Sequence, residues 1–147
     1  MTNLRVLIVD DSGDDAELLL RELRRGGYAP ESLRVDTAGD FAGALESTWD
    51  VILSDYSMPR FSLFAALDIL RERGIDIPFI IVSGTIGEET AVRAMKAGAH
   101  DFVMKDKLAR LAPAIEREMR EAIMRHESRI AAQEVQYTRQ YLASVFN

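Results

Sequence analysis

Five side chains suited to one chemical task stand at or directly after the ends of short apolar runs. Asp10 and Asp11 follow the first run, Asp55 follows another, and Ser83 and Lys105 end or follow two more. Crowded carboxylates repel one another and are costly to desolvate, so such a group commonly holds a cation. Oxygen ligands favour Mg2+, which keeps several waters and often takes a phosphate oxygen. If the five side chains meet, we predict a magnesium site where Asp55 attacks phosphorus as a nucleophile.

The order of the predicted elements explains how these side chains meet. Short runs rich in β-branched residues alternate with stretches of helical period, which is typical of a parallel sheet covered by helices on both faces. The predicted strands are residues 4–9, 33–35, 51–54, 79–83 and 102–104. The handedness of parallel crossovers favours an α/β fold with a doubly wound, five-stranded parallel sheet of order 2-1-3-4-5. We therefore expect the five side chains to converge at the carboxyl edge of this sheet.

Three of the intervening helices carry clear apolar stripes. Their members are Ala16, Leu19, Leu20 and Leu23, then Leu63, Leu67 and Leu70, and finally Leu108, Leu111, Ile115 and Met119. We expect Ser12 or Asp14 to cap the first helix and Asp40 to cap the second. Trp49 is expected to seal the core after the second helix.

Composition narrows the class of protein. The chain has 147 residues, 48% hydrophobic and 29% charged, which suits one globular domain. No window approaches the roughly 18 apolar residues of a membrane span, and the amino terminus lacks the features of a secretion signal. The absence of cysteine excludes disulfides, and the net charge of -6 argues against general nucleic acid binding. We expect a cytoplasmic protein with no direct contact to membrane or nucleic acid.

Four segments resemble the receiver domain of two-component response regulators, over about residues 3 to 123. They are LIVDDS at 7–12, LSDYSMP at 53–59, IIVSGT at 80–85 and AGAHDFVMKD at 97–106. Their order and spacing are together highly specific. The resemblance implies a flavodoxin-like fold and a phosphorelay switch in signal transduction.

The resemblance also implies a role for each residue of the pocket. The residues that correspond to Mg2+ ligands are Asp11 and Asp55, Asp10 through a water molecule, and Ser57 through its backbone carbonyl. Asp55 matches the phosphoacceptor and Lys105 the lysine that contacts the phosphoryl group, with Lys107 as a weaker alternative. Ser83 matches the switch hydroxyl and Phe102 the aromatic rotamer switch.

The implied partner is a sensor histidine kinase or a phosphotransfer protein, and the implied response is a change of the surface around the fourth and fifth helices. Such a chain catalyses its own phosphorylation and dephosphorylation without being a turnover enzyme. A homodimer through the C-terminal helix or through the face of the fourth and fifth helices is a further expectation.

Simpler structural roles remain open for the same residues. Asp10 and Asp11 could cap the following helix, and Lys105 could be an ordinary surface lysine. His100 and His126 have no second histidine nearby in the sequence, so a metal site is not expected. We expect both histidines to be solvated.

Two other functions remain as alternatives. One is an aspartyl-phosphate phosphatase of the haloacid dehalogenase type, although that family expects a second aspartate where this chain has Ser57. The other is an interaction module that works without phosphorylation, although such chains typically lose the phosphoacceptor or the acidic pair.

The pattern of the C-terminal segment predicts a helix that continues beyond the receiver. We place the receiver at residues 1–125 and a helical extension or linker at 126–147, with an output domain beyond as one option. The segment from Pro113 carries five Arg and five Glu, so a DNA-binding output is not encoded here. Met119, Ile123, Ile130 and Tyr137 form an impure coiled-coil seam, with a solvated helix as the alternative.

Overall fold

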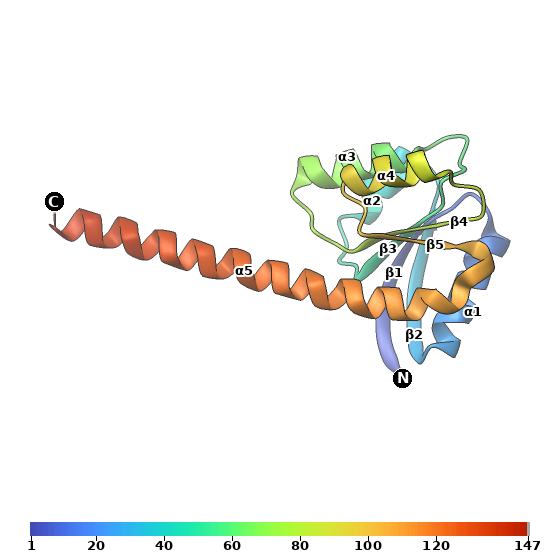
Figure 1. Ribbon diagram of the computed structural model, residues 1–147, viewed down its shortest axis with the longest axis horizontal. Helices are drawn as coiled ribbons and strands as arrows, with labels where there is room; N and C mark the ends of the chain where they lie inside the picture. Colours follow the sequence, from blue (N-terminus) through green and yellow to red (C-terminus); the bar gives the residue numbers. More distant parts are fainter. Residues whose placement is uncertain (147) are drawn as a thin grey trace.

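The computed structural model describes residues 1–146, in which strands and helices alternate (Figure 1). The strands are β1 (Thr2–Val9), β2 (Tyr28–Val35), β3 (Val51–Ser54), β4 (Phe79–Ser83) and β5 (Asp101–Met104). The helices are α1 (Gly13–Arg25), α2 (Ala38–Ala44), α3 (Leu63–Arg73), α4 (Glu88–Lys96) and α5 (Leu111–Phe146), with a 3-10 helix, η1 (Lys105–Arg110), before α5.

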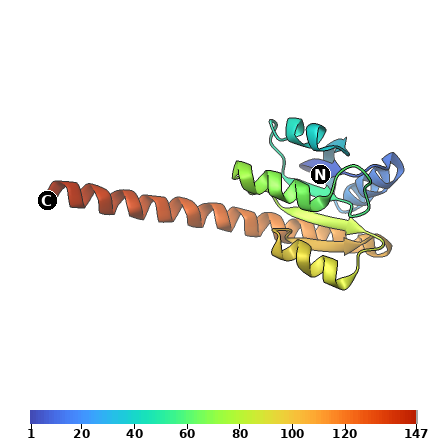
Figure 2. The same cartoon turned by 90° about the horizontal axis from the view of Figure 1, so that it is seen from above.

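The five strands form one parallel sheet in the order β2-β1-β3-β4-β5, which confirms the predicted fold. α1 and the first part of α5 cover one face, and α2, α3 and α4 cover the other (Figures 1 and 2). Side chains of β1 point alternately to the two faces of the sheet and so contribute to both hydrophobic cores. Leu4, Val6 and Ile8 pack toward α1 and α5, whereas Leu7 and Val9 pack toward α2 and α3.

β2 is the strand whose predicted boundaries differ most from the structure. It begins at Tyr28 and pairs with β1 from Thr2 onward, whereas the sequence indicated a strand only over 33–35. β2 is an edge strand in which four of eight residues are exposed and one is buried, so it lacks the apolar alternation that marks a strand. Pro30 fits there because one side of an edge strand needs no ladder donor.

The structure shows which of the predicted residues cap the first two helices. Ser12 caps α1, because its hydroxyl accepts a hydrogen bond from the Asp15 backbone N–H at 3.2 Å. The expectation for Asp40 was wrong, since Thr37 caps α2 and the Asp40 N–H donates to the Thr37 hydroxyl at 3.1 Å. Asp40 lies in the first turn, three residues after Thr37, so its own backbone N–H is one of the donors that the N-cap side chain accepts.

His100 is not a solvated residue, contrary to our expectation. It is half-buried, and its Nδ1 accepts a hydrogen bond from the Phe79 backbone N–H at 2.9 Å. Burial lowers the pKa of His100, and the charge of Arg125 lowers it further. The imidazole therefore binds the start of β4 in its neutral form, whereas His126 is exposed as expected.

α5 spans 36 residues and leaves the globular part of the chain as one unbroken helix (Figure 1). Its first turns bury Leu111, Ala114 and Ile115 against the sheet. No helix in the described part of the chain is both long enough and apolar enough to cross a membrane.

Asp76, in the loop before β4, binds α5 where the helix leaves the domain. Its carboxylate accepts hydrogen bonds from Arg125 Nε at 3.0 Å and from Arg129 Nη1 at 2.8 Å. The hydrogen bond from Arg125 is the main reason why the pKa of Asp76 falls to about 2, with Arg129 adding to it against the effect of burial. These bonds fix the direction in which α5 departs.

Replacing Asp76 should therefore weaken the fold. Each unit of a pKa shift corresponds to about 1.4 kcal/mol, and solvent screening reduces that value at this partly exposed site. We expect Asp76→Asn to lower the free energy of unfolding by about 1 kcal/mol at neutral pH. Because the folded pKa lies below the ordinary 3.8, this contribution is present above that value and is lost as pH falls toward about 2.

Urea unfolding of the wild type and the variant across this pH range measures the effect. Asp68→Asn is the matched control, since Asp68 is exposed and, among the described residues, pairs with Arg71 of its own helix alone. Equal losses in the two variants, or a difference that does not shrink in acid, would contradict the assignment.

Candidate functional site

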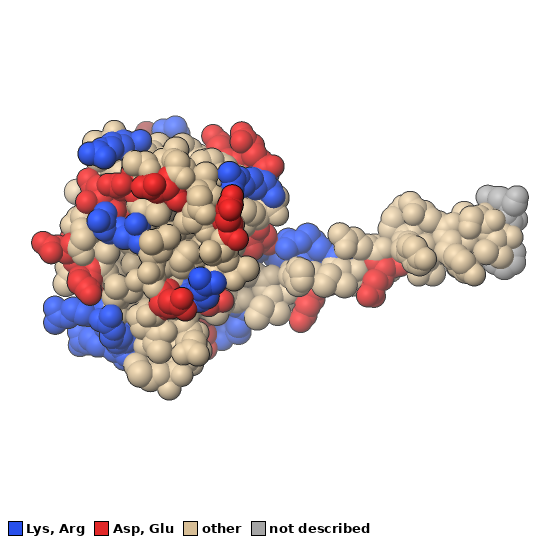
Figure 3. All heavy atoms as spheres, turned by 180° about the vertical axis from the view of Figure 1, so that it is seen from behind, with Lys and Arg blue, Asp and Glu red and all other residues tan. Residues whose placement is uncertain are grey.

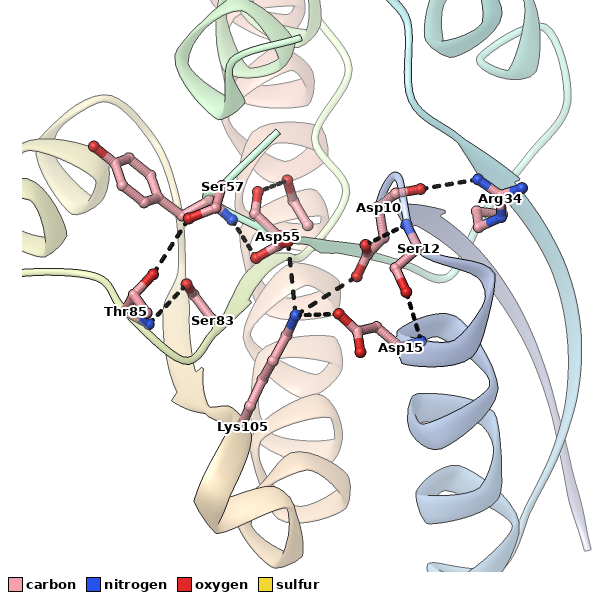
Figure 4. Close-up of polar contacts among 11 residues, drawn as sticks. Asp10, Ser12, Asp15, Arg34, Asp55, Ser57, Ser83, Thr85 and Lys105 are labelled. Carbon is pink, nitrogen blue, oxygen red and sulfur yellow. Dashed lines mark hydrogen bonds and ion pairs between the residues drawn. The ribbon is translucent and has the colours of Figure 1, made fainter. Parts of the chain in front are cut away.

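The carboxyl ends of β1, β3, β4 and β5 bring the predicted residues together at one edge of the sheet (Figure 4). Sheet hydrogen bonding continues one residue past the strands: the Asp10 N–H donates to the Val35 carbonyl at 3.1 Å, and the Asp55 N–H donates to the Val9 carbonyl at 2.8 Å. The backbone of both aspartates is thereby fixed by a neighbouring strand.

Asp10, Asp11 and Asp55 form a compact acidic cluster. One carboxylate oxygen from each lies within 4.8 Å of the other two. Asp10 and Asp55 are buried, with 1% and 7% of their surface exposed, whereas Asp11 is exposed. Asp10 does not cap α1, since Ser12 does, and Asp10 Oδ1 instead accepts the Ser12 N–H at 2.9 Å.

Burial raises the pKa of Asp10 to about 6, and the charge of Asp55 raises it as well. The Ser12 N–H and the ammonium of Lys105 act in the opposite direction but do not restore the ordinary value of 3.8. The cluster therefore has too little positive charge for its carboxylates. A donor set of three such oxygens fits a hard divalent cation, as in the Mg2+ sites typical of this arrangement.

Lys105 is the cation that faces the cluster. Its Nζ lies 3.6 Å from Asp55 Oδ2, 3.9 Å from Asp10 Oδ2 and 2.8 Å from Asp15 Oδ2. Burial lowers the pKa of Lys105, but the bond with Asp15 and the charges of Asp55 and Asp10 outweigh it, so the pKa rises. Lys107, the alternative lysine, is exposed within η1.

The loop after β4 lies beside the loop after β3. Ser83 is buried, and its hydroxyl accepts the Thr85 N–H at 3.4 Å. The Thr85 and Ser57 hydroxyls share a hydrogen bond of 3.2 Å (Figure 4). Ser83 and Ser57 thus reach the edge of the sheet that carries the acidic cluster.

Phe102 on β5 is half-buried beside a hollow between β5 and α4. The hollow measures about 610 Å3, and its lining includes Ile86, Val92 and Met95. The aromatic ring therefore has open volume beside it on the α4 side.

Sequence reasoning missed two residues that contact the site. Asp15 in the first turn of α1 makes the shortest contact with Lys105, and Arg34 Nη1 donates to the Asp10 carbonyl at 3.2 Å. Asp15 lies three residues after the Ser12 cap, which was a signal for its place near the strand ends. Arg34 had no such signal, because it lies on the exposed edge strand.

A family model of the response regulator receiver domain matches residues 6–116. The chain belongs to this family. The acidic pocket and Lys105 are the features through which receivers act as phosphoacceptor switches, and the family implies a histidine kinase as partner. The phosphatase alternative loses its basis, because the fold is that of a receiver and the position that needs a second aspartate is Ser57.

Receivers of several regulators resemble this one. This chain is 32% identical over 105 residues to the transcriptional regulatory protein PrrA of Mycobacterium tuberculosis, and the match covers 71% of this chain and 45% of PrrA. It is 33% identical over 127 residues to the nitrogen assimilation regulatory protein NtrX of Azorhizobium caulinodans, covering 84% and 28%. The crystal structure of FixJ-N superposes with a TM-score of 0.70 at 32% identity, covering 82% and 96%. The receiver thus spans less than half of PrrA and of NtrX.

The contact between Asp15 and Lys105 can be measured by a double-mutant cycle on the free energy of unfolding, in protein kept free of divalent cations. The cycle combines Asp15→Asn with Lys105→Met. We expect a favourable coupling of about 0.5 to 1 kcal/mol, the usual range for a partly exposed ion pair.

Asp14→Asn provides the control for this cycle, because Asp14 is an exposed carboxylate of the same helical turn. Its coupling with Lys105→Met should be near zero. Equal coupling for both aspartates would show that only the general charge of the turn matters.

Proposed function

We propose that Asp55 accepts a phosphoryl group from the phosphohistidine of a kinase or a phosphotransfer protein, in a magnesium-dependent reaction that sets the state of the switch. One observation carries the proposal above all. The buried carboxylate of Asp55 lies 3.6 Å from the ammonium of Lys105 and shares a cluster with Asp10 and Asp11.

In the proposed reaction, an Asp55 carboxylate oxygen attacks phosphorus and the bond between phosphorus and the partner's histidine nitrogen breaks. The electron pair of that bond stays on the imidazole, and an acyl phosphate forms on Asp55. Asp55 Oδ1 accepts the Tyr56 N–H at 2.8 Å, which orients the carboxylate. Lys105 is near enough to pair with a phosphoryl oxygen once the group is attached.

The residues that would hold Mg2+ are Asp11 and Asp55 directly, Asp10 through a water molecule, and Ser57 through its carbonyl. The chemistry that the ion supplies is neutralisation of carboxylate and phosphoryl charge and alignment of the phosphoryl oxygens. The raised pKa of Asp10, which burial causes first and the charge of Asp55 increases, supports this assignment, because added positive charge would stabilise the charged carboxylate.

Ser83 and Phe102 are the residues proposed to report the arrival of the phosphoryl group. The Ser83 hydroxyl holds only a long bond of 3.4 Å to Thr85, so a phosphoryl oxygen can compete for it. Movement of this loop would free space beside Phe102, whose ring borders the hollow against α4. The surface around α4 and α5 would change as a result, shifting a population of two packings.

We also propose that residues 1–125 are the receiver and that residues 126–147 are a helical extension toward an output domain. Asn147, the last residue of this proposed extension, lies outside the described residues. The net charge of -6 supports the proposal that residues 1–147 do not themselves bind nucleic acid directly. A kinase partner of this type would place the reaction in the cytoplasm.

Asp55→Asn tests the site of phosphorylation. Incubation of the wild type with Mg2+ and a small acyl phosphate should add one phosphoryl group, measured by intact mass, and chelation of the metal should prevent it. The variant should remain unmodified because an amide is not a nucleophile here. Labelling of the variant at the wild-type level would falsify the assignment of Asp55.

Lys105→Ala and Ser83→Ala should fail in different ways. Loss of the lysine should slow phosphorylation by about 100-fold, as for other charged groups that stabilise a transition state. Ser83→Ala should slow it by no more than about tenfold, yet the phosphorylated variant should lose most of its conformational response. Phosphorylation rates by mass and hydrogen exchange around α4 measure the two effects, and identical behaviour would refute this division of roles.

A further inference from the structure

The distal part of α5 has no partner within the described chain. Every residue described from 126 to 145 is exposed, and among the described residues Arg129, which pairs with Asp76, is the last residue of α5 to form an ion pair with the rest of the domain. On the face shown in Figure 3, the end of this helix displays almost no charged side chains. Most helical stability in proteins comes from the packing of an apolar face, so contact with another helix would stabilise this exposed segment.

One stripe of this helix has the spacing of a coiled-coil seam. We call it the Met124 stripe. Its members recur at alternating intervals of four and three residues, and none of them is charged. They are Met124, Ser128, Ala131, Val135, Thr138, Leu142 and Val145. The four large members expose 66%, 50%, 47% and 55% of their surface, in the order Met124, Val135, Leu142 and Val145. An apolar period of 3.5 residues produces a left-handed pair of helices.

The seam first indicated by the sequence is less suited to a partner. Met119, its first member, is half-buried against the core of its own domain. Ile123 and His126 line a hollow of about 350 Å3 together with Trp49 and Pro78, so the domain itself crowds this face. Its later positions also include Gln133, which is polar.

The Met124 stripe instead begins beside an open hollow of about 600 Å3 whose lining residues all belong to α5: Glu121, Met124, Arg125, Ser128 and Arg129. The bonds of Asp76 to both arginines hold the helix so that this side stays available. A second helix can therefore approach the stripe from its first member onward.

We propose that a second copy of this chain pairs with the Met124 stripe as a parallel, in-register coiled coil. The flanking charges favour the parallel arrangement. With this seam, Glu134 of one copy lies beside Arg139 of the other in a parallel pair, whereas an antiparallel pair does not bring these two positions together. The seam contains Ser128, Ala131 and Thr138, so the pairing is weak and depends on concentration.

Disulfide crosslinking of the intact chain tests the seam, because the chain has no cysteine of its own. Val135→Cys and Leu142→Cys should each form a homodisulfide quickly, since paired seam residues meet the roughly 6 Å between Cα atoms that a disulfide needs. Ile130→Cys and Tyr137→Cys, on the other stripe, should crosslink at least about tenfold more slowly. Faster crosslinking at Ile130 and Tyr137, or equal rates at all four sites, would overturn the proposal.

Charge exchange tests the orientation independently. Glu134→Arg and Arg139→Glu should each weaken dimerisation by about tenfold in sedimentation, and the double variant should recover most of the loss. A double variant no better than the single variants would reject the parallel register, and a chain monomeric at all concentrations would reject the pairing. Asp55→Asn should dimerise like the wild type, so failure of the phosphorylation proposal and failure of this one are distinguishable.

Discussion

Two carboxylates buried side by side impose the main electrostatic constraint on this fold. Asp10 and Asp55 lie where parallel strands end, both are buried, and the charge of Asp55 acts on Asp10 by repulsion. Lys105 offsets part of that repulsion from the far side of the pocket, where it reaches both of them and Asp15. This compensation matters because an uncompensated buried charge would destabilise the edge of the sheet.

The same constraint explains why the site responds to added charge. A cluster already short of positive charge changes its balance strongly when a cation or a phosphoryl group joins it. The loop after β4 bonds to Ser83 only loosely, since the Thr85 N–H lies 3.4 Å from the Ser83 hydroxyl. Rigid strands thus supply the position of the reactive groups, whereas the loops supply the part that can rearrange.

Much of the fold and most of the pocket could be predicted from sequence because both depend on local signals. β3 and β4 were placed at their observed bounds, since continuous apolar runs end abruptly at Asp55 and after Ser83. Asp15 was missed because its contact with Lys105 joins positions 90 residues apart, one on α1 and one directly after β5. His100 was misjudged because its partner is a backbone N–H of β4, which no side-chain pattern reveals.

α5 follows β5 and runs back along the sheet, so it emerges at the edge opposite the acidic cluster (Figure 1). Asp76 forms ion pairs there with two arginines of α5 that lie one turn apart, and the helix then continues without a break. Because the helix is continuous, each residue inserted into it rotates the segment that follows by about 100° around the helix axis. The length of this helix therefore determines the rotation of any group attached to its end relative to the receiver. An insertion of seven residues nearly preserves that orientation, whereas an insertion of two turns the group to about the opposite side.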